Sequence, residues 1–209
     1  MKPLIALSLL FFSSNLWAQS SWEPLKQIVI KTDVMSPNHK EKLQWVKQAR
    51  ELADQCVAAH PADAGCYYYR GQATGLYYDE VIFGYQNGVR SMIKDWEAAL
   101  KLDPAFDHGG PDRMLGELYS SLPKYFGTKD VRQDLSKALE HLKKSVEIDP
   151  NYPTQRFDLA EVFLKIKMKE EADSMLKEAQ KLMPEWQNDP YFAGWQDTNK
   201  DLKRKLVHR

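Results

Sequence analysis

Residues 157–184 read FDLAEVFLKIKMKEEADSMLKEAQKLMP, and small and large apolar residues recur along this segment at fixed intervals. Its first half carries Leu159-Ala160 and, three residues later, the aromatic Phe163. Its second half carries a small, a large and a small residue and then a proline, namely Ala172, Leu176, Ala179 and Pro184. Spacings of three and four residues place these side chains on one face of each of two consecutive helices.

The same order is typical of the tetratricopeptide repeat, a helix–turn–helix unit of about 34 residues, and it recurs upstream. One unit carries Leu115-Gly116, Tyr119, Ala138, Leu142, Ser145 and Pro150. Another carries Arg70-Gly71, Thr74, Met92, Trp96, Ala99 and Pro104, and a further second helix carries Ala49, Ala53, Cys56 and Pro61. These prolines are 43, 46 and 34 residues apart, and the excess over one repeat falls mainly around Tyr78–Val89 and Pro123–Arg132.

Small residues at the first-helix position let two helix axes approach closely, and a proline ends the second helix. Each unit leaves an apolar face that only the next unit can cover. The sequence therefore predicts an all-α fold, a right-handed superhelix of stacked tetratricopeptide helix hairpins (an α-solenoid), over residues 19–185. We expect residues 186–209 to form a C-terminal capping helix or tail, whose basic amphipathic end, from Lys200 to Arg209, has the alternative of touching a membrane or an acidic partner.

The first residues have the order of a secretory signal peptide: Lys2, an apolar run from Leu4 to Phe12, and Ala18 before the expected cut. That run is too short for a membrane span, which takes about 20 apolar residues. Gln19 stands where a lipoprotein would carry its acylated cysteine. Residues 1–18 are thus predicted to be removed, leaving a periplasmic or secreted, soluble protein without a lipid anchor.

In an oxidising compartment the cysteine pair Cys56 and Cys66 has two interpretations. The repeat register places Cys56 near the end of one helix and Cys66 near the start of the next, so a disulfide is one possibility. Two small core residues at a helix interface are the other.

The sequence offers little for catalysis or metal binding. Its five histidines are isolated, no serine lies in a nucleophile-elbow pattern, and no glycine-rich phosphate loop is present. Loss of Lys2 would leave 28 basic residues against 29 acidic ones, which gives no general attraction to nucleic acid. We therefore expect a non-enzymatic protein that needs no metal or cofactor and does not bind nucleic acid.

The first helices of successive hairpins should together form a concave surface, on which aromatic and polar side chains suit recognition of a peptide or protein. The residues expected there are Tyr68, Gln72, Arg113, Glu117, Phe157, Asp158 and Glu161. For the tyrosines, packing between helices is the competing interpretation.

Beyond the general repeat, LKLDPAFDHGGPDRMLGELY at residues 100–119, followed by Leu122-Pro123, resembles the T component (TatT-like) family of tripartite ATP-independent periplasmic (TRAP) transporters. The likeness continues through Phe126-Gly127, Ala138–Pro150, Tyr152-Pro153 and Leu159-Ala160-Glu161, and covers about residues 45–184. The resemblance implies a helical-repeat fold, a periplasmic location and a non-enzymatic binding role, with a solute-binding protein as the partner in some members.

Two functions follow from these observations. The first is a periplasmic protein-interaction module whose concave face holds a protein or peptide, such as a TRAP-type solute-binding protein. The second is a small-molecule binder with a pocket lined by tyrosines and tryptophans near Tyr78–Val89, which a closed, mostly apolar cavity would support and a solid core would exclude.

Overall fold

The computed structural model describes residues 20–35, 38–81 and 83–208, and throughout these ranges the chain is built of helices and their connections, with no strand. The helices are α1 (Glu23–Val34), α2 (His39–Ala59), α3 (Ala64–Glu80), α4 (Tyr85–Leu102), α5 (Phe106–Ser121), α6 (Leu135–Ile148), α7 (Thr154–Lys165), α8 (Lys169–Leu182) and α9 (Phe192–His208). Short 3-10 helices cover Lys129–Val131 (η1) and Met183–Trp186 (η2). The signal peptide predicted for residues 1–18 lies outside the described residues.

Side-chain caps explain where several of these helices begin. Asn38 accepts a hydrogen bond from the Glu41 amide, and Asp63 accepts one from the Gly65 amide. Asp134 accepts from the amides of Ser136 and Lys137. Each oxygen satisfies backbone donors that the first turn of a helix leaves free.

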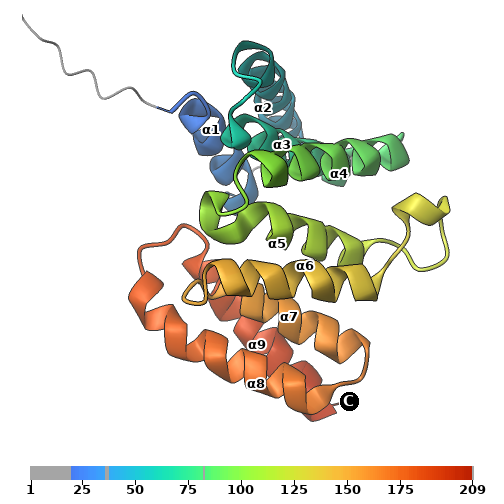
Figure 1. The fold of residues 1–209 in the computed structure, drawn as a ribbon, viewed down its shortest axis with the longest axis vertical. Helices are drawn as coiled ribbons and strands as arrows, with labels where there is room; N and C mark the ends of the chain where they lie inside the picture. The colour runs from blue at the N-terminus through green and yellow to red at the C-terminus, as the bar shows by residue number, and fades with distance from the viewer. Residues whose placement is uncertain (1–19, 36–37, 82, 209) are drawn as a thin grey trace, which may run out of the picture.

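The predicted hairpins are confirmed: α3 pairs with α4, α5 with α6 and α7 with α8, and the pairs lie in layers one after another (Figure 1). The small first-helix residues are the points of closest approach. A Cβ atom on Gly116 would lie 2.6 Å from Cγ of Leu142, and Ala160 is buried. A larger side chain at either point would push the paired helices apart.

The excess residues of the second unit lengthen its helices. α3 and α4 have 17 and 18 residues, whereas α7 and α8 of the unmodified unit have 12 and 14. The excess of the third unit forms the α5–α6 connection that holds η1. Arg90 joins α4 to this connection. Its Nε lies 2.6 Å from Oδ2 of Asp130, and its Nη2 donates to Oγ1 of Thr128 at 2.7 Å.

Near its start, α5 is kinked at the Asp107-His108-Gly109 segment, three consecutive left-handed residues with φ values of 49°, 63° and 72°. A Cβ on Gly109 would lie 3.2 Å from the backbone of Ser145, so both the conformation and the space favour glycine. Side chains hold the other two residues in place. Tyr68 donates to Oδ2 of Asp107 at 2.6 Å, and Gln155 donates to the carbonyl of His108 at 2.7 Å.

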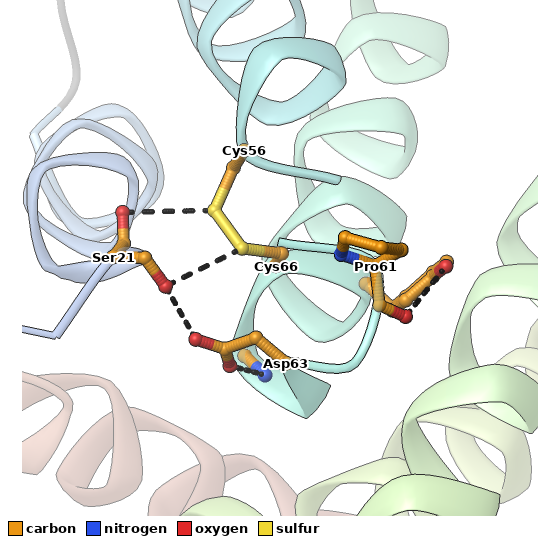
Figure 2. The surroundings of a disulfide bond; sticks show 7 residues. Ser21, Cys56, Pro61, Asp63 and Cys66 are labelled. Atoms are coloured by element: carbon orange, nitrogen blue, oxygen red, sulfur yellow. Dashed lines mark hydrogen bonds between the residues drawn. A yellow bond between two sulfur atoms is a disulfide. The ribbon is translucent and has the colours of Figure 1, made fainter. Parts of the chain in front are cut away.

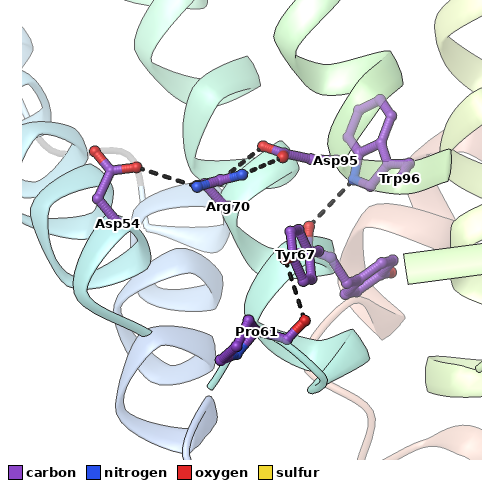
Figure 3. Close-up of polar contacts among 7 residues, drawn as sticks. Asp54, Pro61, Tyr67, Arg70, Asp95 and Trp96 are labelled. Carbon is purple, nitrogen blue, oxygen red and sulfur yellow. Dashed lines mark hydrogen bonds and ion pairs between the residues drawn. The ribbon is translucent and has the colours of Figure 1, made fainter. Parts of the chain in front are cut away.

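An ion pair between Arg70 and the buried Asp95 fixes α3 against α4 (Figure 3). Arg70 donates two hydrogen bonds to Asp95, from Nε to Oδ2 at 2.9 Å and from Nη2 to Oδ1 at 2.6 Å, while its Nη1 lies 3.5 Å from Oδ1 of Asp54 on α2. Beside it the Trp96 indole donates to the carbonyl of Tyr68 at 3.1 Å. Three consecutive helices are thus joined by planar groups of fixed geometry.

Cys56 and Cys66 are joined by a disulfide bond, the first of the two interpretations open from the sequence (Figure 2). The bond links the end of α2 to the start of α3, whose Cα atoms at these positions are 5.4 Å apart. Closing a loop of about ten residues stabilises a fold by roughly 2–3 kcal/mol in the chain-entropy description. Ser21, before α1, hydrogen-bonds Asp63 close to this bridge and brings the N-terminal segment against it.

The two terminal helices lie at opposite ends of the layers. α1 buries Leu25 and Val29 and packs against α2 and α3. α9 buries Trp195 and Leu202 and packs against α7 and α8. Among the helices so described, none is both long enough and apolar enough to cross a membrane.

Candidate functional site

A pocket of about 600 Å³ lies on the concave side of the layers. Its walls come from the first helices of the hairpins, α3, α5 and α7, and from part of α4. The terminal helices add to it from either end: α1 contributes Val29 and Asp33, and the α9 region contributes Tyr191, Gly194, Trp195 and Thr198. Segments that are far apart in the sequence therefore share one hollow.

Of the seven residues expected on the concave face, four line this pocket: Gln72, Arg113, Glu117 and Asp158. They come from three successive first helices, as the repeat register predicts. The register thus places the polar residues of separate hairpins around one space.

The other three expected residues lie outside the pocket. Tyr68 and Phe157 are buried between helices, in agreement with the packing interpretation of the tyrosines. Oε1 of Glu161 lies 3.8 Å from Nζ of Lys205 on α9. Successive residues of a helix differ by about 100° in direction, so Phe157 points into the core while the adjacent Asp158 points to the pocket.

Tyr68 nevertheless acts on the site, because it holds Arg113. Nη2 of Arg113 donates to the Tyr68 hydroxyl at 3.0 Å, and that hydroxyl donates to Asp107. Nη1 of Arg113 lies 3.6 Å from Oε2 of Glu117, one helical turn further along α5. The left-handed segment at Asp107 is therefore connected to the pocket wall through one tyrosine.

The pocket carboxyl groups have raised pKa values. For Asp33, Asp79, Glu117 and Asp158 the largest cause is burial, which disfavours the charged form. The second cause for Asp158 is the neighbouring charge of Glu117. Half of the Glu117 side-chain surface is exposed to the open space of the pocket, yet protein surrounds the carboxylate on its other sides, which is why burial still raises its pKa.

Aromatic rings form much of the remaining wall. They are Tyr78, Tyr85, Trp96, Tyr152, Tyr191 and Trp195. Tyr78 and Tyr85 come from the lengthened α3 and α4, where the sequence placed its candidate small-molecule pocket. Tyr152 packs edge-on against Trp195 with ring centroids 5.5 Å apart.

The sequence reasoning missed the contribution of α1 and α9. Residues 23–34 carry no repeat signature, and residues 186–209 are predicted only to form a capping helix or tail. Asp33 and Tyr191 both line the pocket, and Tyr191 opposes the rise in the Asp33 pKa, although burial remains the larger cause. An apolar-and-acidic pattern at Val29 and Asp33 was the signal available for α1.

Four buried polar atoms of pocket residues have no hydrogen-bond partner: the hydroxyls of Tyr85 and Thr154, Nε of Arg113 and Oδ2 of Asp158. An unpaired buried polar atom costs about 1–3 kcal/mol. The lining contains neither histidine nor cysteine, and within the described ranges no cluster of three potential metal ligands occurs. The geometry is therefore suited to holding a molecule by shape, charge and hydrogen bonds.

Comparison with solved structures gives the class of fold. The chain is similar to TTC0263, a thermophilic tetratricopeptide-repeat protein of Thermus thermophilus, with a TM-score of 0.61 and 18% identity over 88% of this chain and 89% of that one. YrrB, a tetratricopeptide-repeat protein with an unusual peptide-binding site, has a TM-score of 0.46 and 16% identity over 89% of this chain and 92% of that one. No protein-family model and no curated protein sequence matches the chain. The fold is an all-α solenoid of the tetratricopeptide type.

Proposed function

We propose that this chain is a non-enzymatic binding protein that holds a compact ligand in the pocket on its concave side. The observation that carries the proposal is the convergence of α1, α9 and three first helices on one space of about 600 Å³. Ligand pockets of proteins have volumes of about 300–1,000 Å³ and combine apolar walls with a few convergent polar groups. The aromatic rings and the charged residues described above supply both.

The positions of the terminal helices favour a compact ligand over a long peptide. An extended peptide lying along the first helices would have to pass α1 at one end and α9 at the other, and both of these helices line the same space. The small-molecule function expected from Tyr78–Val89 therefore comes first, and a short segment of a partner protein would have to enter the same space.

The pocket proposal is tested with the neutral apolar dye Nile red, titrated into the protein from residue 19 onward. We expect a saturable rise in fluorescence with one dye bound per chain, because the dye leaves water for an apolar wall. A signal that grows in proportion to dye without saturating would contradict a defined pocket.

A protein partner is the second candidate, supported by exposed aromatic residues on the two inserted segments. Phe83, Tyr125 and Phe126 are 92%, 82% and 65% exposed, and exposed aromatic groups of this kind often mark interaction surfaces. Tyr85, which stacks with Phe126 at a centroid distance of 6.1 Å, also lines the pocket. A protein docked on these residues would therefore lie next to the ligand. The partner that we propose for this surface is a periplasmic solute-binding protein of a TRAP-type transporter.

The partner proposal is tested by size-exclusion chromatography of the purified protein with a TRAP-type solute-binding protein from the same organism. We expect co-elution, and we expect a Phe83→Ser, Tyr125→Ser double variant to elute separately. Elution of the unchanged proteins as two independent peaks would contradict this partner while leaving the pocket proposal intact.

A further inference from the structure

The charged residues lining the pocket are strongly unbalanced. Four are acidic (Asp33, Asp79, Glu117 and Asp158) and one is basic (Arg113), so when all are ionised three negative charges have no positive counterpart in the lining. They come from α1, α3, α5 and α7, so the excess surrounds the space from several sides. The chain as a whole has equal numbers of acidic and basic residues, so the acidic excess is a local property of this pocket.

The basic groups near the pocket contact other protein groups, although Nε of Arg113 is buried without a hydrogen-bond partner. Arg113 lies beside Glu117 and donates to Tyr68, which contacts Asp107. Lys42, the cation that most lowers the pKa values of Asp33 and Asp79, has its Nζ 2.9 Å from Oε1 of Glu80. Among the described residues, no ion pair joins a lysine or arginine to Asp33, Asp79 or Asp158.

Asp158 shows the cost of this arrangement most clearly. Its Oδ2 atom is buried without a hydrogen-bond partner, and its pKa lies well above the usual range because of burial and the nearby Glu117. A buried carboxylate is stabilised by an opposite charge within a few ångströms and destabilised by a like charge. Near Asp158 the protein places the like charge of Glu117, and the opposite charges of Arg113 and Lys165 each lower the Asp158 pKa by less than Glu117 raises it.

The aromatic rings add a second attraction for cations. The faces of tyrosine and tryptophan rings carry partial negative charge and attract ammonium and guanidinium groups. Six such rings line the space together with the acidic residues; Tyr78, Tyr85 and Tyr191 are partly exposed, and Trp96, Tyr152 and Trp195 are buried. This is the combination by which proteins recognise amines and quaternary ammonium groups.

We propose that the ligand of this pocket is an organic cation: a protonated amine or alkylated ammonium group on an apolar body. The inference rests on the proposed function of the pocket as a ligand site. The cation lies among the carboxylates of Glu117 and Asp158, and the apolar body packs on the aromatic wall. An anionic ligand of the same shape meets repulsion from the ionised carboxylates of the lining, which Arg113 offsets only in part.

The experiment uses three probes that share one body and differ in charge: 4-phenylbutylamine, 4-phenyl-1-butanol and 4-phenylbutyrate. Their affinities are measured at neutral pH by isothermal titration calorimetry and by displacement of Nile red. We expect the amine to bind about tenfold more tightly than the alcohol, from the combined charge and ring contributions, and the acid to bind most weakly.

Two charge-removing variants of similar shape, Glu117→Gln and Asp158→Asn, should each weaken the amine several-fold and leave the alcohol unchanged. Asp173→Asn is the matched control, because Asp173 on α8 pairs with Lys177 at 2.6 Å away from the pocket, and it should change neither affinity. Circular dichroism and the urea unfolding midpoint establish that each variant is folded.

The outcomes separate the two proposals. An amine that binds no more tightly than the alcohol, or an acid that binds most tightly, overturns the cation inference while the ligand pocket stands. Equal weakening of amine and alcohol by Asp158→Asn also overturns it, since the residue would then act through shape alone. Failure of Nile red and all three probes to bind overturns the proposed function itself.

Discussion

Replacing Gly71 with alanine is expected to lower the free energy of unfolding by about 3 kcal/mol, the upper part of the range for overpacking a core. The added Cβ would lie 2.3 Å from Nε1 of Trp96, closer than non-bonded atoms approach. The indole cannot easily move aside, because it is 2% exposed and its Nε1 donates to the Tyr68 carbonyl. The strain would therefore separate α3 from α4. Urea unfolding followed by circular dichroism measures the effect.

The matched control is the same substitution at Gly194, within α9. A Cβ there meets no atom within 4 Å, and alanine is favoured over glycine inside a helix by about 1 kcal/mol. We expect Gly194→Ala to unfold at the same or a higher urea concentration than the unchanged protein. If Gly71→Ala were as stable as Gly194→Ala, close packing at Gly71 would not be what joins this hairpin.

The contact at Gly71 shows how much of the fold the sequence predicts. Gly71, Gly116 and Trp96 recur at repeat positions, so their close approach follows from periodicity alone. Periodicity also predicts that Gln72, Arg113, Glu117 and Asp158 share one face, because equivalent positions of stacked helices are neighbours. It places Tyr68 and Phe157 on that face wrongly, because a shift of one residue along a helix turns the side-chain direction by about 100°.

The positions of α1 and α9 are the part of the fold that the sequence predicts least. α1 and α9 belong to no repeat, so no register relates Asp33 to Tyr191 or either to Asp158. α1 is held by α2 and α3, and α9 by α7 and α8, so Asp33 and Tyr191, which are 158 residues apart, line one pocket, a relation that a single sequence does not display. The pocket thus combines a predictable concave wall with two walls that only the folded chain reveals. Its acidic excess is likewise a sum over four helices that local patterns do not show.

Those unpredicted walls allow a direct test of the pocket through Gly194. Gly194→Phe is expected to weaken binding of Nile red and of 4-phenylbutylamine by about 100-fold, or about 2.7 kcal/mol of binding free energy. Gly194 lines the pocket, and the open space around its Cβ position lets a benzyl group extend into the volume that a ligand needs. The protein itself should stay folded, because the ring meets space that is otherwise filled by solvent. Calorimetric titration and thermal unfolding measure the two quantities on the same sample.

Gly194→Ala separates filling of the pocket from any effect of changing α9. Like Gly194→Phe, it replaces glycine by a residue that favours the helix more, but its single methyl group leaves most of the volume free. Its affinities should therefore stay within about twofold of the unchanged protein, a difference below about 0.5 kcal/mol. Unchanged binding by Gly194→Phe would place the ligand outside this space. A loss shared equally by both variants would point instead to a movement of α9, because the methyl group is too small to displace a ligand.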